Sequence, residues 1–173
     1  MVVGGTWDPR AGAAVGTMFG EAPRSIRTAA RVAFGGGSPN AIEPDDFQRL
    51  VDRLLANLHV SNPTFSIELD PRTMTREWAD VIGRVGIERA SLGVQTFSAQ
   101  CQEAIGRVQS EDCIVQTVDW LRGAGVTSLN FDLMYGLPGQ TMHDLEDSLQ
   151  RTRVLGADHL RDRGRAGPRQ RIR

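Results

Sequence analysis

The sequence predicts an α/β fold in which four βα units build a parallel sheet. Two features of the pattern support this prediction. Segments with the two-residue alternation of strands are each followed by a segment with the 3.6-residue period of helices. The centres of successive strand-like segments lie 25 to 39 residues apart, which suits crossover connections between parallel strands. Four units are too few for a closed eight-stranded barrel, so they fit part of a barrel or an open sheet.

Four segments have the composition and alternation of strands. They comprise residues 31–35, 64–70, 89–94 and 127–134. The first is an apolar run that ends at three glycines, and the second alternates apolar and polar residues. In the fourth, Leu129, Phe131 and Leu133 fall on one side of the strand. We therefore expect four parallel strands that form an open arc, with helices on one face.

Helical periodicity follows each of these strands. The expected helices cover residues 44–58, 75–85, 98–106 and 110–124, and a fifth begins at Thr141. Pro44 suits a first helical position, and Gly86 and Gly125 suit the ends of the second and fourth helices. Thr141 and Asp144 have the spacing of a capping box, in which two residues satisfy each other's backbone N–H groups.

Residues 31–157 contain the whole repeating pattern, and the two ends differ from it. Residues 1–30 are rich in Gly, Ala and Arg and show no clean period, so we expect an irregular segment. Residues 158–173 carry Arg, Gly and Pro with no apolar period, so we expect a basic, disordered tail. All 20 basic residues of the chain are Arg, which suggests a GC-rich coding sequence. A GC-rich sequence that is read out of frame gives runs of Arg, Gly and Pro like those of residues 158–173. A frameshift near Leu160 is a second hypothesis for this end, and the first segment is open to the same explanation or to a misassigned start.

Composition limits the class of protein. With 40% hydrophobic and 24% charged residues, the chain is expected to be globular, and no apolar run reaches the ~18 residues of a membrane span. The first residues lack the basic flank and apolar core of a signal peptide, so we expect a cytoplasmic protein. The absence of Lys excludes a Walker A loop and a Schiff-base lysine. We expect a monomer that binds no membrane and no nucleic acid, although the arginines of the tail could contact phosphates.

The two cysteines do not predict a metal site. Cys101 and Cys113 are twelve positions apart, a spacing that matches neither zinc ligands nor cluster ligands. Both stand among apolar residues in helical segments, so we expect buried structural thiols and assign no metal ligand.

Polar residues gather at the carboxyl ends of the four strands, the edge at which parallel α/β folds bind ligands. Three glycines and Ser38 follow the first strand, Glu68 lies near the end of the second, and Gln95 follows the third. Asp132 lies in the fourth strand, and Arg107 in the helical stretch after the third. Glycine lets backbone approach a ligand, carboxylates and amides bind hydroxyl or ammonium groups, and Arg pairs with a carboxylate. This edge therefore suits a zwitterionic ligand that carries hydroxyl groups.

Five blocks resemble, in order, the motifs of oxygen-independent coproporphyrinogen III oxidases, a family of radical S-adenosylmethionine (SAM) enzymes. The blocks read FGGGSP, SIELDPRT, SLGVQTF, GRVQ and NFDLMYGLPGQT. They lie between about Val32 and Arg151. Together they are specific, because five short blocks at compatible spacing are hard to meet by chance. The resemblance implies that the four units are part of a (β/α)6 radical-SAM barrel.

The resemblance also implies a SAM pocket and a reaction. The pocket residues are Gly36, Gly37, Ser38, Glu68, Gln95, Arg107 and Asp132. By chemistry, Arg107 suits the methionine carboxylate and Asp132 and Gln95 suit the ribose hydroxyls. Glu68 suits the ribose or the methionine ammonium. In the family, a [4Fe–4S] cluster cleaves SAM, and the resulting 5′-deoxyadenosyl radical takes a hydrogen from a propionate of coproporphyrinogen III. Loss of CO2 and one electron leaves a vinyl group, and two such events give protoporphyrinogen IX in haem biosynthesis.

The chain departs from the family in its cysteines. The family holds the cluster with a C-x3-C-x2-C motif that precedes the glycine block, and here no cysteine precedes Cys101. We therefore expect a fragment of the oxidase that is inactive alone, with no catalytic residue of its own. Two alternatives stay open: the haem-chaperone branch of the superfamily, and a non-catalytic ligand-binding or interaction module. The GRVQ and ELDPRT blocks favour the oxidase over the chaperones.

Overall fold

The computed structural model describes residues 2–3, 31–57 and 63–164. Six strands form one sheet in chain order, and every neighbouring pair is parallel. The strands are β1 (Val2–Val3), β2 (Arg31–Phe34), β3 (Thr64–Leu69), β4 (Ile87–Gln95), β5 (Ser128–Tyr135) and β6 (His159–Gly164). The predicted parallel α/β sheet is confirmed, and it has two more strands than the four expected.

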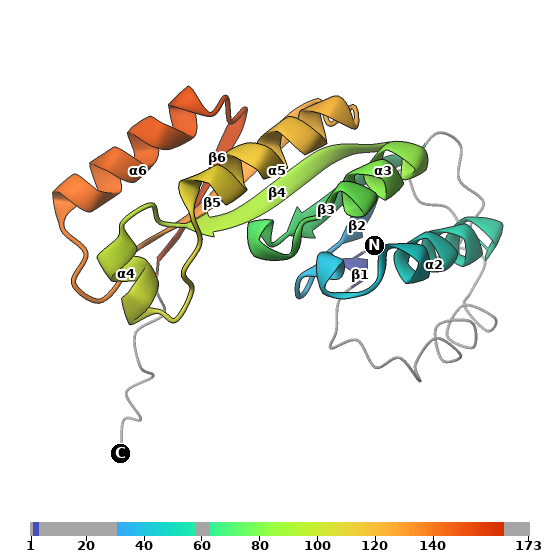
Figure 1. Cartoon of the computed structure of the whole chain (residues 1–173). Helices are drawn as coiled ribbons and strands as arrows, with labels where there is room; N and C mark the ends of the chain where they lie inside the picture. The colour runs from blue at the N-terminus through green and yellow to red at the C-terminus, as the bar shows by residue number, and fades with distance from the viewer. Residues whose placement is uncertain (1, 4–30, 58–62, 165–173) are drawn as a thin grey trace, which may run out of the picture.

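The helices lie mainly on one face of this sheet. They are α2 (Pro44–Asn57), α3 (Arg76–Val85), α4 (Ala99–Ala104), α5 (Glu111–Gly123) and α6 (Met142–Val154), with single 3-10 turns η3 (Pro39–Ala41) and η4 (Pro71–Thr73). Figure 1 shows α2, α3, α5 and α6 following one another over one face, as predicted for a partial barrel, and α4 beyond the end of β4. None of the helices in the described ranges is both long and apolar enough to cross a membrane.

Alternation along the strands explains this arrangement. In β3, Phe65, Ile67 and Leu69 are buried against the helices, so Ser66 and Glu68 point to the opposite face. We call that opposite face the inner face of the sheet. Polar residues of the other strands share it, because parallel strands in register place paired residues on the same side.

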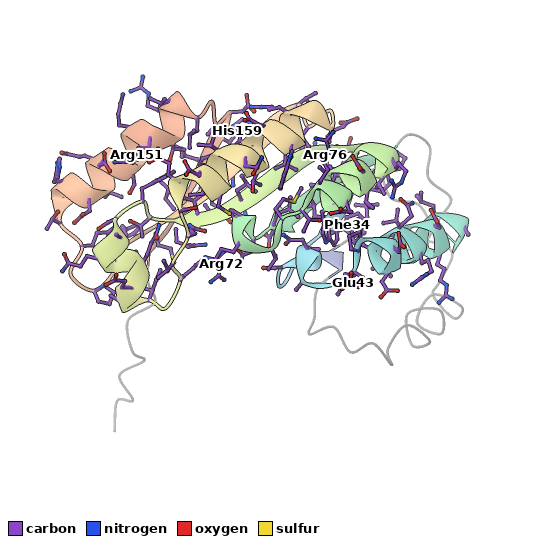
Figure 2. The ribbon with its side chains drawn as sticks, viewed as in Figure 1. Phe34, Glu43, Arg72, Arg76, Arg151 and His159 are labelled. Atoms are coloured by element: carbon purple, nitrogen blue, oxygen red, sulfur yellow. The ribbon has the colours of Figure 1, made fainter. Side chains whose placement is uncertain are left out.

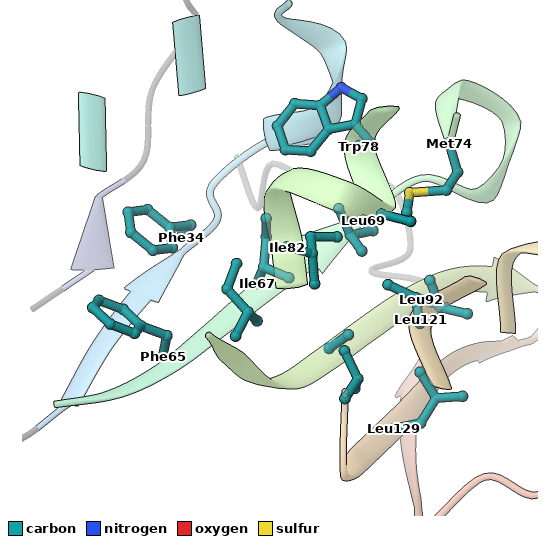
Figure 3. Close-up of a cluster of buried hydrophobic side chains, with 14 of the residues drawn as sticks. Phe34, Phe65, Ile67, Leu69, Met74, Trp78, Ile82, Leu92, Leu121 and Leu129 are labelled. Atoms are coloured by element: carbon teal, nitrogen blue, oxygen red, sulfur yellow. The ribbon is translucent and has the colours of Figure 1, made fainter. Parts of the chain in front are cut away.

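The apolar layer between the sheet and the helices is continuous (Figure 3). At one end the ring of Phe47 lies 5.0 Å from that of Phe34 and 4.9 Å from that of Trp78. The Trp78 indole donates to the carbonyl of Ile42 at 3.2 Å, so its one polar atom is satisfied. At the other end Leu92 of β4 is fully buried. Burial of this layer fixes the helices over the sheet and leaves the inner face to polar residues.

The helix ends follow the sequence signals. Thr141 and Asp144 form the predicted capping box at the start of α6. Gly86 ends α3 in the left-handed conformation, with φ 73°. The helix expected over residues 44–58 ends at Asn57, and Leu58 lies outside the described ranges.

The C-terminal end differs from the prediction. The sequence predicts a disordered tail from residue 158, and this is wrong for His159–Gly164, which pair with β5. The backbone N–H and C=O groups at the edge of β5 can pair with any extended segment, because this pairing does not depend on the side chains of that segment. Asp158 aligns this segment, because its Oδ2 accepts from the Leu129 N–H and from Arg122, both at 2.8 Å.

At the other end, Val2–Val3 form β1, within the segment expected to be irregular. The rest of residues 1–30, and residues 165–173, lie outside the described ranges. A strand does not test the reading frame, so the frameshift hypothesis stays a prediction.

Candidate functional site

The loop after β2 brings backbone against the acid that β3 contributes. Gly36 has φ 89°, a left-handed conformation that favours glycine. A Cβ atom on Gly35 would lie 2.9 Å from the carboxyl group of Glu68, so any larger residue would have to displace that side chain. Ser38 precedes η3 and does not cap it with its hydroxyl. The glycine loop and Glu68 therefore meet at the carboxyl end of the sheet, as predicted.

Asn40, which the sequence analysis did not single out, fastens this loop to the residue after β3. Its side chain is buried, donates to the main-chain carbonyl of Asp70 at 2.7 Å and accepts from the Asp70 N–H at 3.0 Å. Both bonds join residues 30 positions apart in the chain. Because the partner is so distant, no local pattern marks Asn40 as a pocket residue.

Gln95 ends β4 in a strained turn. Its φ is 69°, and it is the only residue other than glycine with a positive φ in the described ranges. The Thr96 N–H donates to the carbonyl of Val94 at 2.9 Å, which closes a γ-turn around Gln95. A positive φ at the central residue of a γ-turn is less favourable than the negative φ of the common inverse γ-turn. The side-chain amide of Gln109 donates to the same carbonyl. Such strain costs roughly 1–3 kcal/mol and persists where the surroundings enforce it, often at functional sites.

A row of polar side chains crosses the inner face from β3 to β5. Ser91 and Asn130 donate to Oδ1 of Asp132 at 3.1 Å and 2.8 Å, and Asn130 also donates to Ser91 at 2.6 Å. Glu68 pairs with Ser91 in register, so it is a neighbour of the same row. Asp132 is only 7% exposed. Its carboxylate therefore has a fixed orientation that does not depend on a ligand. Ser91 and Asn130 were missed, although the two-residue period places Asn130 on the same side as Asp132.

Arg107 follows α4 and folds back over β4. Its Nη2 donates to the carbonyl of Gly93 at 2.9 Å and lies 3.1 Å from Oδ2 of Asp70. A Cβ on Gly93 would lie 3.1 Å from this Nη2 and 3.0 Å from Nε2 of Gln95, so glycine leaves room for both side chains. Gly93 also pairs with Asp132 in register, so Arg107 and Gln95 lie over the residue of β4 that neighbours Asp132. Burial lowers the pKa of Arg107, and the Asp70 carboxylate opposes that shift.

β6 adds a second guanidinium to the inner face. Arg161 Nη1 lies 3.8 Å from Oε1 of Glu68, and Arg161 Nε lies 3.9 Å from Oδ1 of Asp132. These distances are too long for hydrogen bonds but within the range of ion pairs. Arg161 lies in the segment that the sequence predicts to be disordered, so the sequence analysis missed it. The two acids of the predicted pocket therefore flank an arginine.

The cysteines of this chain do not fit an iron–sulfur cluster. Cys101 is fully buried in α4, and the thiol of Cys113 donates to the carbonyl of Pro71 at 3.1 Å. Burial raises the pKa of Cys113, and the Asp70 carboxylate raises it further. Within the described ranges, no group of three His, Cys, Asp or Glu residues could hold a metal ion.

The inner face, in contrast, presents carboxylate, amide and guanidinium groups of the kinds that bind a ligand such as SAM. Gly35 and Gly93 leave space that a Cβ would fill, next to carboxylate, amide and guanidinium groups. A groove of about 550 Å³ lies elsewhere, between α3 and α5, and is lined by Arg76, Trp120 and their neighbours. In Figure 2, Arg76 marks the groove and Arg72 marks the carboxyl end of β3. None of the predicted pocket residues lines the groove.

Known proteins share both the sequence and the fold. A match to the Radical SAM superfamily covers residues 21–152. The oxygen-independent coproporphyrinogen III oxidase of Bradyrhizobium diazoefficiens is 38% identical over 130 residues, which are 75% of this chain and 29% of the oxidase. The heme chaperone HemW of Bacillus subtilis is 32% identical over 130 residues, 74% of this chain and 34% of the chaperone. The structure of coproporphyrinogen III oxidase (HemN) from Escherichia coli, a radical SAM enzyme, matches with a TM-score of 0.83. It is 30% identical, over 89% of this chain and 36% of its own.

These similarities cover the part of the chain that contains the candidate site. The chain spans only 29% to 36% of the length of these relatives. The superfamily match nevertheless includes β2 to β5, the strands that carry the predicted pocket residues. Similarity to the Escherichia coli structure supports the partial barrel inferred from the motifs. The chain therefore belongs to the radical SAM superfamily.

Proposed function

We propose that this chain forms the SAM-binding part of an oxygen-independent coproporphyrinogen III oxidase, an oxidoreductase of haem biosynthesis. One observation carries the proposal: the acids of β3 and β5 lie on the inner face on either side of Arg161, and Gln95 and Arg107 lie over Gly93, the residue of β4 that pairs with Asp132. Proteins of that name are 31% to 38% identical to the chain, which supports the choice of this reaction within the superfamily.

The chemistry of SAM matches these groups one by one. Asp132, held by Ser91 and Asn130, is suited to accept hydrogen bonds from the ribose hydroxyls. Glu68 is suited to the ribose or to the methionine ammonium, and Arg107 to the methionine carboxylate. Gly36 and its neighbours leave room for the ligand to contact backbone. The inner face would thus bind and orient SAM.

In the complete enzyme, a [4Fe–4S] cluster supplies the electron that cleaves SAM. The cysteines of this chain do not fit that cluster, so our proposal assigns SAM binding to the chain and not turnover. The chain alone is then expected not to convert coproporphyrinogen III, even with SAM and a reductant. The porphyrinogen substrate would be bound together with other parts of the enzyme.

Titration calorimetry with SAM tests this proposal. Asp132→Asn and Glu68→Gln should each weaken SAM binding by about ten-fold, since each removes a charged hydrogen-bond acceptor. Asp80→Asn on α3 and Glu146→Gln on α6 make the same chemical changes at exposed helical positions and should not alter binding. Circular dichroism must show that all variants are folded. A folded wild-type chain that does not bind SAM would refute the proposal.

A second candidate is the haem-chaperone branch, which the similarity to HemW supports. Haem titration followed by absorption spectroscopy separates the two. Tight haem binding together with no SAM binding would favour the chaperone, and the reverse result would favour the oxidase.

A further inference from the structure

A charged cluster lies where β3 ends, and of its members only Arg107 belongs to the predicted pocket residues. It consists of Asp70, Arg72, Arg107 and Cys113, and we call it the Asp70 cluster. Arg72 belongs to η4, Arg107 to the loop after α4, and Cys113 to the first turn of α5. Figure 2 shows Arg72 at this edge of the sheet, near the chain that leads from α4 to α5. Three separate parts of the chain therefore converge on one carboxylate.

Asp70 is the centre of this cluster. Its side chain is only 6% exposed. It accepts from the main-chain N–H of Arg72 at 3.0 Å and from Nη2 of Arg72 at 2.7 Å. Nη2 of Arg107 lies 3.1 Å from its Oδ2. Burial opposes ionisation, but the hydrogen bonds from Arg72 and the charge of Arg107 outweigh it, so the pKa of Asp70 lies below its usual value.

Asp70 connects two walls of the candidate SAM site. Its main chain binds Asn40 of the glycine loop, and its carboxylate binds Arg107, which also donates to Gly93. Nε of Arg107 is buried and has no hydrogen-bond partner in the described ranges. One negative charge serves two guanidinium groups in this cluster. Arg107 is therefore fixed in place without being fully neutralised.

We propose that Asp70 is a positioning residue of the SAM site, which holds the Arg107 guanidinium over Gly93 so that it meets the carboxylate of the ligand. This inference rests on the proposed function and adds a residue to it. The opposite effect is that Asp70 competes with the ligand carboxylate for Arg107. The two effects differ in sign: removal of the Asp70 charge weakens SAM binding if Asp70 positions Arg107 and strengthens it if Asp70 competes.

Asp70→Asn separates these effects, because asparagine keeps the shape and can still accept from the Arg72 main chain. Calorimetry should show SAM binding about ten-fold weaker and adenosine binding within about two-fold of wild type, since adenosine has no carboxylate. The matched control is Asp147→Asn on α6, which also loses a carboxylate that pairs with an arginine. This control should leave both affinities unchanged. Tighter SAM binding by Asp70→Asn, or an equal loss for both ligands, would overturn the inference.

Alkylation of Cys113 by iodoacetamide gives a second readout without SAM. Asp70→Asn removes a carboxylate that raises the pKa of this thiol and leaves the Arg72 guanidinium, which lowers that pKa, so Cys113 should react faster at neutral pH. Cys101 is fully buried and serves as the internal reference for folding. An unchanged rate for Cys113 would show that the charge of Asp70 does not act within the cluster, against the inference.

Two further outcomes have defined meanings. If the folded wild-type chain does not bind SAM, the proposed function fails, and the inference fails with it. If wild type binds SAM but the circular dichroism of Asp70→Asn shows that this variant is unfolded, the inference is tested with Arg107→Lys instead. Lysine keeps the charge but cannot present the same fork to Gly93 and Asp70, so it should weaken SAM binding and spare adenosine. Wild-type SAM affinity in Arg107→Lys would overturn the inference.

Discussion

Asn40→Ala should destabilise the fold far more than a typical polar substitution. The Asp70 carbonyl loses one hydrogen bond but keeps the Thr73 N–H at 3.2 Å, so this part costs about 1 kcal/mol. The buried Asp70 N–H loses its Asn40 acceptor, which costs about 1–3 kcal/mol. The sum is a loss of about 2–4 kcal/mol in the free energy of unfolding.

Urea unfolding, followed by circular dichroism and extrapolated to water, measures this loss. His143→Ala is the control, because His143 is exposed in the first turn of α6, and it should change stability by less than about 0.5 kcal/mol. If Asn40→Ala costs no more than the control at an unchanged denaturant slope, the two bonds do not hold the glycine loop as we argue.

Three further predictions concern α6 and the site. Hydrogen bonds from Thr141 and Ser98 hold the pKa of Asp144 at about 2, below its ordinary value of 3.8, so the capping box stabilises the fold above pH 3.8 and loses this effect as the pH falls toward 2. Asp144→Asn should therefore lower the urea midpoint at neutral pH and have a much smaller effect at pH 2. Arg161→Ala should tighten SAM binding with little change in stability, because this exposed cation lies near the two pocket acids; weaker binding would contradict this. Arg107→Ala should weaken SAM binding about ten- to a hundred-fold by calorimetry and leave adenosine unaffected, while His143→Ala should change neither.

Most of the fold can be predicted from local sequence. In β3 and β5 the two-residue alternation marks the buried side, and Gly86 and the Thr141–Asp144 pair mark helix ends by their chemistry. β6 could not be predicted in this way. Its side chains carry no apolar alternation, and the strand exists because the edge of β5 pairs with its backbone.

The site could be predicted only in part. Strand-end positions identify Glu68 and Asp132, because parallel strands bring their carboxyl ends to one edge. The contacts of Asp70 with Asn40 and Arg107 could not be predicted, since each joins residues that are far apart in sequence and adjacent only in the fold. The sequence analysis expected the Arg107 guanidinium to pair with a ligand carboxylate and did not predict that it also pairs with Asp70.

The central claim is that SAM binds on the inner face at the carboxyl ends of β2 to β5. Backbone amide chemical shifts of the 15N-labelled chain, recorded by NMR with and without SAM, test it most directly. The account predicts shifts at Gly36, Gln95 and Asp132 and none at Gly83 and Gly123, which line the groove between α3 and α5. Shifts confined to that groove, or no shifts at saturating SAM in the folded chain, would contradict it.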